Sequence, residues 1–288
     1  MSNRAVLSVD FELFTQTPAY RSAPGTTDEK DVGLAAGTYL RQSLDIHDAR
    51  ATFFVVSSVA ERHPEVIRAF AETGHEIGSH THTHAVLTDL DVAARRDELK
   101  HSRALLRDIT DQPIDGFRAP VFALPPDHFE RLDEAGYTYD SSIAPCRHIP
   151  GWYGGEYTVD RPVPATQIRP EAPTDITELP VSVMPGLRLP LTGTWIRFFG
   201  HRYTLLGMKL LARRGITPVL YVHPWELVDL PPVEGVPKRV YWHTGKWMRR
   251  TLRHLLGSSF EFVTAKTAIE DATAPAGDGL LTSCSGRT

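Results

Sequence analysis

The segment Ala5-Val-Leu-Ser-Val-Asp10-Phe-Glu12 joins a nearly continuous apolar run to two acidic residues. An apolar run of this length, without polar alternation, is typical of a strand that is covered on both faces of a parallel sheet. Asp10 and Glu12 stand two residues apart, so along a strand their side chains would point the same way. The segment therefore predicts a buried strand over residues 5–9 that leads into two carboxylates.

Apolar runs and segments of helical periodicity alternate along the rest of the chain. Further strands are expected at residues 51–56, 75–79, 115–118, 137–140, 178–183, 216–222 and 260–263. Helices are expected at residues 31–47, 58–74, 91–109, 126–135, 202–214 and 245–256. Residues 11–30 and 145–173 are expected to form long loops at the site. Repetition of strand and helix favours an α/β fold with parallel pairing and ligands at the carboxyl ends of the strands.

The bulk composition narrows the class of protein. With 288 residues, 41% of them hydrophobic, the chain can bury one large core, and α/β barrels of this length often form a single domain. The formal net charge of −4 and a pI near 6.3 give no general attraction to nucleic acid. We expect one catalytic domain over residues 1–273 and a disordered tail over residues 274–288, which is small and polar.

Signals of cellular location are few. The first predicted strand begins so early that a secretory leader has no room, and no apolar run reaches the roughly 18 residues that span a bilayer. Cys146 and Cys284 lie far apart without metal-ligand spacing, which suits a reducing compartment. A cytoplasmic protein is the expectation.

A histidine-rich stretch, His80-Thr-His82-Thr-His84, follows the third predicted strand. On a continuous strand the three imidazoles would share one face, whereas in a turn or helical segment His80 and His84 would converge. Imidazoles together with the carboxylates of Asp10 and Glu12 suit a divalent metal of the zinc, cobalt or iron type. One carboxylate could ligate the metal while the other accepts a proton from water. The alternative is a solvated polar loop with ordinary loop carboxylates.

Two more predicted strand ends carry polar groups suited to the same reaction. Arg118 could orient a catalytic carboxylate through a bidentate pair, or be an ordinary surface cation. His223 follows another strand, and the ordinary histidine pKa of about 6.5 suits a general acid near neutral pH. Because the carboxyl ends of parallel strands meet at one edge of a sheet, four such ends together favour an active site there.

Taken in order, these segments resemble the polysaccharide deacetylases of the NodB-homology type, carbohydrate esterase family 4. The motifs that carry the resemblance are Ser-Val-Asp10-Phe-Glu12, Gly74-His-Glu-Ile-Gly-Ser-His80-Thr-x-x-His84, Gly116-Phe-Arg118-Ala-Pro120, Tyr139-Asp140-Ser-Ser-Ile and His223-Pro-Trp-Glu226. The last motif is similar to that of exosortase-associated deacetylases. The resemblance covers residues 5–269 and implies a distorted (β/α) barrel of about seven parallel strands. It also implies metal-dependent hydrolysis of N-acetyl groups on sugars, with zinc before cobalt, iron or nickel.

The resemblance implies three metal ligands and three residues that act in the reaction. The ligands it implies are Glu12, His80 and His84. The reacting groups it implies are Asp10 as the base, Arg118 as the residue that holds the base, and His223 as the general acid.

Two further residues would contact the substrate. The backbone N–H of Val121 falls where the family helps to stabilise the oxyanion, and Trp225 would line the acetyl pocket. His82 has no role that the resemblance assigns.

Two features depart from the family pattern. First, most members carry adjacent aspartates, whereas Asp10 and Glu12 are two residues apart. A related branch with this spacing includes enzymes that act on imides, ureides or formamides instead of sugars. Second, most extracellular members of the family have signal peptides, and none is expected here. A cytoplasmic deacetylase would act more naturally on a lipid- or nucleotide-linked sugar before export. The alternatives are therefore the same chemistry on a small amide or cyclic imide, in an allantoinase-like reaction, or a non-catalytic carbohydrate-binding relative.

Two surface features remain open. The aromatic residues Trp152, Tyr153 and Tyr157 could line a groove for a polysaccharide or pack against the barrel. Residues 235–259 contain no acidic residue but six basic ones: Lys238, Arg239, Lys246, Arg249, Arg250 and Arg253. This run could contact an anionic membrane, although such runs are more often solvated helix faces.

Overall fold

The computed structural model describes residues 3–24, 31–149 and 154–274. The strands are β1 (Arg4–Phe11), β2 (Thr52–Val55), β3 (Glu76–Ser79), β4 (Gly116–Phe117), β5 (Tyr139–Asp140), β6 (Val163–Pro164), β7 (Thr177–Glu178), β8 (Val219–Val222) and β9 (Glu261–Val263). The α-helices are α1 (Pro18–Arg21), α2 (Ala36–Ile46), α3 (Ser57–Arg62), α4 (Pro64–Glu72), α5 (Val92–Thr110), α6 (His128–Ala135), α7 (Gly193–Ala212), α8 (Lys246–Leu256) and α9 (Ala265–Thr273). Short 3₁₀ helices are η1 (Phe14–Gln16), η2 (Leu87–Asp89), η3 (Pro120–Phe122), η4 (Ala165–Gln167), η5 (Pro224–Leu227) and η6 (Lys238–Val240).

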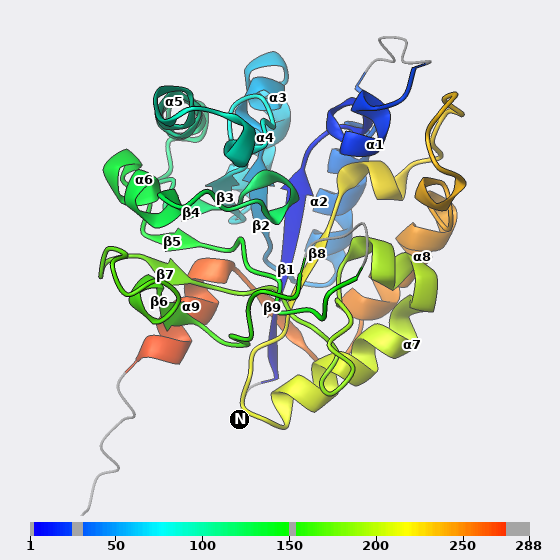
Figure 1. Cartoon of the computed structure of the whole chain (residues 1–288). Helices are drawn as coiled ribbons and strands as arrows, with labels where there is room; N and C mark the ends of the chain where they lie inside the picture. Colours follow the sequence, from blue (N-terminus) through cyan, green and yellow to red (C-terminus); the bar gives the residue numbers. More distant parts are fainter. Residues whose placement is uncertain (1–2, 25–30, 150–153, 275–288) are drawn as a thin grey trace, which may run out of the picture.

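The strands form one curled sheet with helices on its outer face (Figure 1). Its order is β6-β7-β5-β4-β3-β2-β1-β8, with β9 paired to β1, and every pair is parallel except β6 with β7. Beyond β7 the chain returns to β8: the Ser182 N–H donates to the Val219 carbonyl, and the Val219 N–H donates to Ser182 Oγ, both at 2.8 Å. The predicted distorted (β/α) barrel is confirmed.

Strand β1 pairs with β2, β8 and β9, and its burial explains the apolar run that opens the chain. Leu7 and Val9 pack into the larger core, which lies between the sheet and its helices. Val6 belongs to the smaller core inside the barrel, and Ser8 follows it there with its hydroxyl donating to the Leu220 carbonyl at 2.9 Å. Both faces of β1 are therefore buried, and the strand delivers its last residues to the upper edge of the barrel.

Aromatic packing fixes the helical layer against β1 and β2. The rings of Phe53 and Phe70 stack with centroids 3.9 Å apart, and Phe11 meets Phe70 edge to face at 5.4 Å. All three rings are almost completely buried, and each contributes about 1.5–3 kcal/mol by leaving water. This cluster holds α4 over the strands that carry the predicted site residues.

Several predicted boundaries are wrong for identifiable reasons. The expected loop at residues 11–30 contains η1 and α1, and the expected helix at residues 58–74 divides into α3 and α4 at His63, just before Pro64. Helix α7 starts at Gly193, well before the predicted residue 202, because Gly200 with φ of 77° interrupts the helical pattern. Helix α9 was not predicted at all.

Other boundaries shift by less. The strand predicted at residues 178–183 is shortened to β7, with Val183 forming only an isolated bridge to Pro190. The expected loop at residues 145–173 includes β6 and η4. The predicted tail lies outside the described residues apart from Ala274, so its disorder and the single catalytic domain stay predictions.

One buried histidine below the site makes the fold sensitive to acid. His75 is 3% exposed and lies 5.5 Å from the Phe53 ring, and its Nδ1 accepts the Ala51 N–H at 3.4 Å. Burial, with a smaller effect of the Arg50 charge, lowers the pKa of His75 from 6.5 to about 4. Between these two values the unfolded chain binds a proton that the folded chain does not, so stability falls as the pH falls through this window.

We therefore expect His75→Gln to flatten the pH dependence of folding. Between pH 7 and pH 4.5 the loss in free energy of unfolding should shrink by roughly 1–2 kcal/mol relative to the unchanged chain. Urea denaturation in the presence of EDTA measures this without a contribution from metal release. His101→Gln, which replaces an exposed histidine, is the control. An unchanged slope in His75→Gln would contradict the assignment.

Candidate active site

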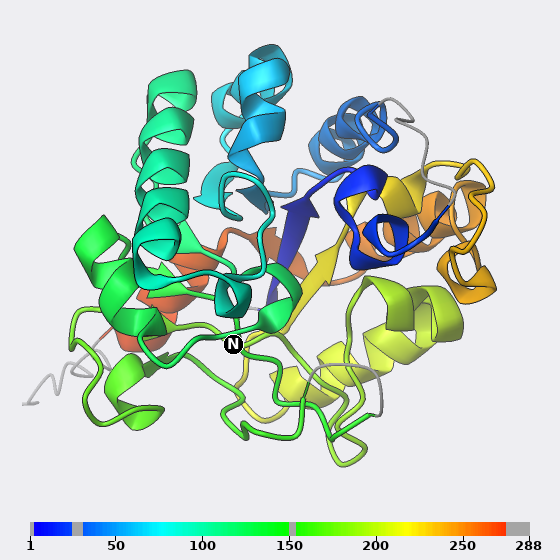
Figure 2. The ribbon, with the colours of Figure 1, turned by 45° about the horizontal axis from the view of Figure 1, so that its top comes forward.

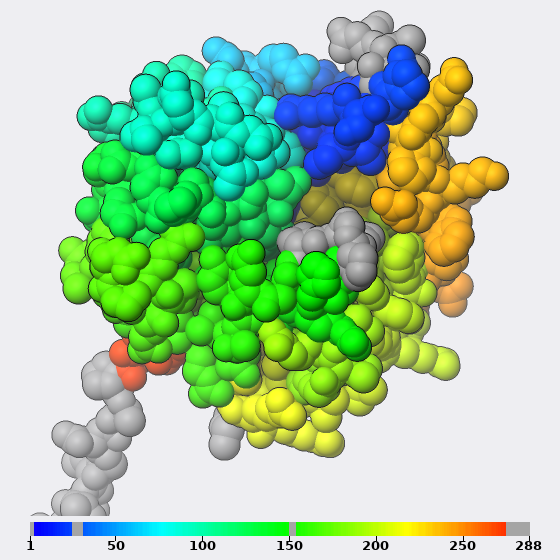
Figure 3. All heavy atoms as spheres, in the orientation of Figure 1, coloured from blue at the N-terminus to red at the C-terminus, as the bar shows by residue number. Residues whose placement is uncertain are grey.

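The predicted site residues gather at the carboxyl ends of the central strands. A cavity of about 700 Å³ opens there, and Figure 3 shows the surface hollowed between the blue first segment and the gold segment after η5. Figure 2 gives the arrangement of β1 and β8 beneath this opening. The predicted residues that line the cavity are Asp10, Glu12, His80, His84, Val121, His223 and Trp225. Arg118, the remaining one, lies beneath Asp10 and is fully buried.

The histidine stretch converges by turning away from the line of β3. Thr81 and His84 have positive φ values of 64° and 59°, so the backbone turns sharply after the strand. As a result the His80 and His84 rings lie 4.9 Å apart, edge to face. His82 points elsewhere: its Nδ1 lies 2.9 Å from Ser57 Oγ. Of the two arrangements that the sequence left open, the structure has the turn.

Three side chains offer a compact set of metal donors. One atom each of Glu12, His80 and His84 can be chosen so that all lie within 4.8 Å of one another, and all three residues are buried. The His80 Nδ1 lies 2.7 Å from the Arg118 carbonyl, which can only accept, so Nδ1 carries the hydrogen and Nε2 keeps its lone pair for an ion. His84 Nε2 contacts the Glu12 carboxylate directly. A carboxylate with two oriented imidazoles fits a zinc-type ion.

The electrostatics of these donors agree with that use. Burial lowers the pKa of His80 to about 4, which keeps the imidazole neutral and able to bind an ion. Burial alone would raise the pKa of Glu12, but the neighbouring imidazoles, His84 above all, hold it below its usual range. The chain thus presents an ionised carboxylate beside a neutral imidazole at neutral pH.

Asp10 is held by a buried arginine. The Arg118 Nη1 donates to Asp10 Oδ1 at 2.6 Å and to Ser8 Oγ at 2.8 Å. Its Nε donates to the Ser141 carbonyl at 2.8 Å and its Nη2 to Ser141 Oγ at 2.7 Å. The guanidinium also lies 4.3 Å from the centre of the Phe54 ring. Arg118 is therefore no surface cation, and it fixes the Asp10 carboxylate at the floor of the cavity.

His223 is held on the other side of the donor set. Its Nε2 lies 3.8 Å from Glu12 Oε1, and its Nδ1 lies 3.3 Å from Glu226 Oε2. Glu226 also accepts from the His223 backbone N–H at 3.0 Å and from Arg197 Nε at 2.8 Å. Burial would lower the pKa of His223, but the Glu226 carboxylate, with Glu12 and Asp10, raises it to about 9. His223 is therefore a cation at neutral pH in this arrangement.

Helix α7 supplies the space and the charge that Glu226 needs. The helix begins at Gly193, where a Cβ atom would overlap the Glu226 carboxylate, so glycine permits this close approach. Arg197, one turn later, is 1% exposed and donates to the carbonyls of Val240 and Trp242 as well as to Glu226. Although burial opposes ionisation, Arg197 and His223 hold the pKa of Glu226 below its usual range.

Val121 and Trp225 lie at the cavity where the sequence placed them. Val121 has φ of 51°, is 37% exposed and lines the cavity. The Trp225 ring stacks on His223 at 5.0 Å, and its Nε1–H donates to Glu12 Oε1 at 3.1 Å. Trp225 therefore touches a candidate metal ligand as well as lining the cavity, a contact that the sequence did not predict.

Several residues behind the cavity support the site, although the sequence indicated no role for them. Ser142 Oγ accepts the Ala119 N–H at 2.8 Å and donates to Asp140, whose other oxygen lies 2.7 Å from His128 Nε2. These bonds fix the backbone just before η3, the turn that carries Val121. Ser141 and Glu226 support the charged groups in the same way. Their only sequence signal was membership of the motifs around Asp140 and His223.

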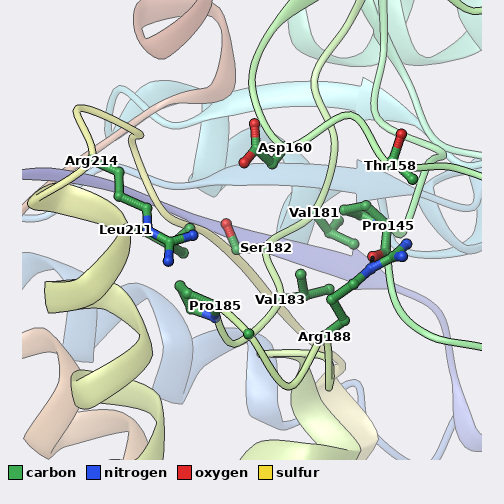
Figure 4. A pocket seen from close by; sticks show the side chains of 11 residues that line it. Pro145, Thr158, Asp160, Val181, Ser182, Val183, Pro185, Arg188, Leu211 and Arg214 are labelled. Carbon is green, nitrogen blue, oxygen red and sulfur yellow. Dashed lines mark hydrogen bonds between the residues drawn. The ribbon is translucent and has the colours of Figure 1, made fainter.

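The other cavities differ in their relation to the site. One of about 210 Å³ shares Val121 and Phe122 with the main cavity and extends toward Glu156 and Tyr157. Trp152 and Tyr153, its predicted companions in a groove, lie outside the described residues. Another of about 240 Å³ is shown in Figure 4, and none of the described residues that line it belongs to the site motifs. Its Arg188 donates to the carbonyls of Pro145 and Tyr157 and so braces the loop.

In the part of the chain that the structure describes, no helix combines the length and the apolar character required to cross a bilayer. The location of the protein stays a prediction.

We expect Arg118→Leu to lower the free energy of unfolding by about 3–5 kcal/mol, because it leaves the Asp10 carboxylate buried without its cation. The double variant Asp10→Leu/Arg118→Leu removes the unpaired charge and should recover part of the loss. Urea unfolding of the metal-free protein, followed by circular dichroism, measures both. Arg107→Leu, which changes an exposed arginine, is the control. Equal stability of the Arg118 single variant and the unchanged chain would contradict a buried pair.

Comparisons with known proteins agree with this geometry. The family described as polysaccharide deacetylase matches residues 34–139, and a domain of unknown function, DUF3473, matches residues 141–270. A chitin deacetylase from Colletotrichum lindemuthianum is 37% identical over 97 residues, which cover 31% of this chain and 37% of that protein. Matches to other curated deacetylases also span less than half of those proteins.

Solved structures share the fold over nearly the whole chain. A Mycobacterium smegmatis protein assigned to the polysaccharide deacetylases has a TM-score of 0.61 at 24% identity, covering 93% of this chain and 90% of its own. The structure of PuuE allantoinase has a TM-score of 0.64 at 18% identity, and the match covers 95% of this chain and 92% of that one. The segment 34–139, with both histidine ligand candidates and Arg118, is matched by the family itself. Over that segment this chain is similar to the polysaccharide deacetylase family, and over nearly its whole length it shares the fold of the solved structures.

Proposed function

We propose that this protein is a metal-dependent hydrolase that removes N-acetyl groups from an amino sugar in a polysaccharide or in a lipid- or nucleotide-linked glycan. One observation carries the proposal. Asp10, held by a buried arginine, and His223, held by a buried carboxylate, line one cavity together with the donor set Glu12, His80 and His84. A held base and a held acid beside a metal site are what amide hydrolysis requires.

The donor set would hold zinc, before cobalt, iron or nickel. When bound, such an ion polarises the amide carbonyl and makes water a stronger nucleophile. Two features of the donors support this: the imidazoles keep the pKa of Glu12 low, and His80 presents Nε2 to the cavity side of the donor set.

The chain's own groups then divide the proton transfers. Asp10, kept in place by Arg118, takes a proton from the attacking water. The Val121 N–H donates to the carbonyl oxygen as it gains negative charge. His223, kept cationic by Glu226, gives its proton to the departing sugar nitrogen, which leaves as an amine while acetate forms. Each of the two proton transfers uses a side chain whose orientation is fixed by a buried partner.

The size of the cavity favours a glycan over a small imide. About 700 Å³ is ample for a ligand-binding pocket, and the adjoining cavity beside Tyr157 offers room for a neighbouring sugar unit. The relative named chitin deacetylase points the same way. The allantoinase of similar fold keeps the small-imide reaction as the second candidate. Asp10 and His223 are both present, which weighs against a non-catalytic relative.

His80→Ala is expected to abolish stoichiometric metal binding, because one of three protein donors is lost. Metal content after dialysis, measured by plasma mass spectrometry, tests this. His82→Ala is the matched control, since it removes a histidine from the same turn whose side chain bonds Ser57 instead. A metal-free His80→Ala protein with full activity would overturn the metal role.

Asp10→Asn is expected to keep the metal but to lower the turnover number by roughly 10²–10⁴-fold, because the amide cannot accept the proton of water. Metal content and acetate release measured on one preparation separate the two effects. If metal and activity disappear together, Asp10 is a ligand and the roles of the two carboxylates are assigned wrongly.

The substrate class needs a direct comparison. We would assay acetate release from N-acetylglucosamine oligomers and from nucleotide-linked N-acetyl sugars, alongside ring opening of allantoin. Acetate release that is lost in Asp10→Asn supports the proposal. Ring opening without acetate release would mean that the same residues catalyse the second candidate reaction, hydrolysis of a small imide.

A further inference from the structure

We propose that the outer faces of α7 and α8 form a docking surface for an anionic membrane. The surface, called here the α7–α8 surface, consists of Phe199, Arg202, Leu206, Lys209, Arg213, Trp242, Lys246, Arg250 and Arg253. All nine residues are exposed. It lies within the segment matched by the domain of unknown function, and no site residue belongs to it.

The two helices place these residues on one continuous face. After the break at Gly200, the exposed positions 202, 206 and 209 of α7 and position 213 at its C-cap recur every three or four residues, which is one stripe of a helix; Phe199 is exposed just before the break. The rings of His201 and His254 stack 4.4 Å apart, so the stripe of α7 adjoins that of α8. Figures 1 and 2 both show α7, in yellow-green, beside α8, in orange, at one side of the molecule.

This face is strongly positive although the whole chain is negative. No acidic residue occurs in residues 179–225 or 235–259, the two segments that supply the surface. Within the described ranges, none of its six cations forms an ion pair. Burial lowers the pKa of His201, and the positive charges around it, including Arg202 and Arg250, lower it further. The surface therefore offers uncompensated charge to an anionic partner.

The structure also shows which cations of the predicted basic run belong elsewhere. Arg249 turns inward, where its Nε donates to the Leu227 carbonyl at 2.6 Å and its guanidinium lies 4.8 Å from the centre of the Tyr39 ring. Arg239 lines the catalytic cavity. The exposed charge comes instead from α7 and α8 together, and the α7 half was not visible in the basic run.

Exposed apolar side chains distinguish a membrane from other polyanions. Phe199, Leu206 and Trp242 are 50%, 54% and 58% exposed, and they interleave with the cations. Aromatic and aliphatic groups beside Lys and Arg suit the boundary between lipid headgroups and acyl chains. A nucleic acid or another soluble polyanion would be held by the charges and would not require the aliphatic Leu206.

The surface is connected to the mouth of the catalytic cavity. Ring contacts run from Trp242 to Phe198 at 5.8 Å, from Phe198 to Trp195 at 6.2 Å, and from Trp195 to Phe199 at 5.9 Å. Thr194 and Val240, which flank this aromatic row in the chain, line the cavity. A protein docked by this surface would hold its cavity near the headgroups, which suits a lipid-linked glycan; this last step rests on the proposed hydrolase activity.

The test is co-sedimentation of the full chain with vesicles at low salt. Vesicles of phosphatidylcholine alone are compared with vesicles that also contain phosphatidylglycerol. We expect binding only to the anionic vesicles, weakened at least tenfold in Arg202→Gln/Arg250→Gln and also clearly weakened in Phe199→Ser/Leu206→Ser. Arg96→Gln/Arg107→Gln removes two exposed arginines of α5, on another side of the molecule, and should bind like the unchanged chain.

Several results would overturn the proposal. The first is that the protein does not bind anionic vesicles at low salt. The others are that the α5 control loses vesicle binding as much as Arg202→Gln/Arg250→Gln does, or that Phe199→Ser/Leu206→Ser binds vesicles as well as the unchanged chain. If heparin binds the protein and Phe199→Ser/Leu206→Ser does not weaken its vesicle binding, the surface serves a soluble polyanion. Acetate release from a soluble substrate is measured in every variant and should stay unchanged, so that a failure of docking is distinguishable from a failure of the proposed activity.

Discussion

The arrangement of the barrel depends on the burial of one guanidinium. Arg118 has no exposed surface, and its N–H groups bond Ser8 and Asp10 of β1 and both oxygens of Ser141 after β5. A buried cation is tolerated only when its donors are satisfied and a counter-charge is close. The position of the Asp10 carboxylate is therefore a consequence of how the interior of the barrel balances its own charge.

A similar principle operates on the other side of the cavity. Arg197, almost fully buried, neutralises Glu226, and Glu226 in turn orients His223. Asp10 and His223, the two groups proposed to react, thus each have a partner that lies deeper in the protein and is shielded from water. Buried ion pairs contribute little to stability on balance, because desolvation offsets their attraction. Their value in this chain is orientation, since a carboxylate and an imidazole fixed in this way need not reorganise during a reaction.

The fold could be predicted from the sequence, and the eight candidate site residues could be named from local signals together with the family resemblance, although their roles stay predictions. Buried strands are short apolar runs, and residues such as Asp10, Glu12 and His223 directly follow them. The supporting contacts could not be read in the same way, since Ser141 and Arg197 meet their partners across 23 and 29 residues of intervening chain. Two other features depend on local backbone geometry that the sequence does not reveal. Positive φ at Thr81 turns His82 away from His80 and His84, and the break at Gly200 made the first half of α7 unrecognisable as a helix.

The indole of Trp225 has a consequence for which ions the protein can retain. Its N–H donates to Oε1 of Glu12, and His84 Nε2 contacts Oε2 of the same carboxylate, so both oxygens are held by side chains of the site. Calcium is normally surrounded by six to eight oxygens, often including a carboxylate that binds through both, and magnesium also prefers an all-oxygen shell. A donor set of one carboxylate and two imidazoles suits neither. The two imidazoles of the set thus weigh against both of these oxygen-preferring cations, and the tryptophan hydrogen bond anchors the carboxylate that stands beside them.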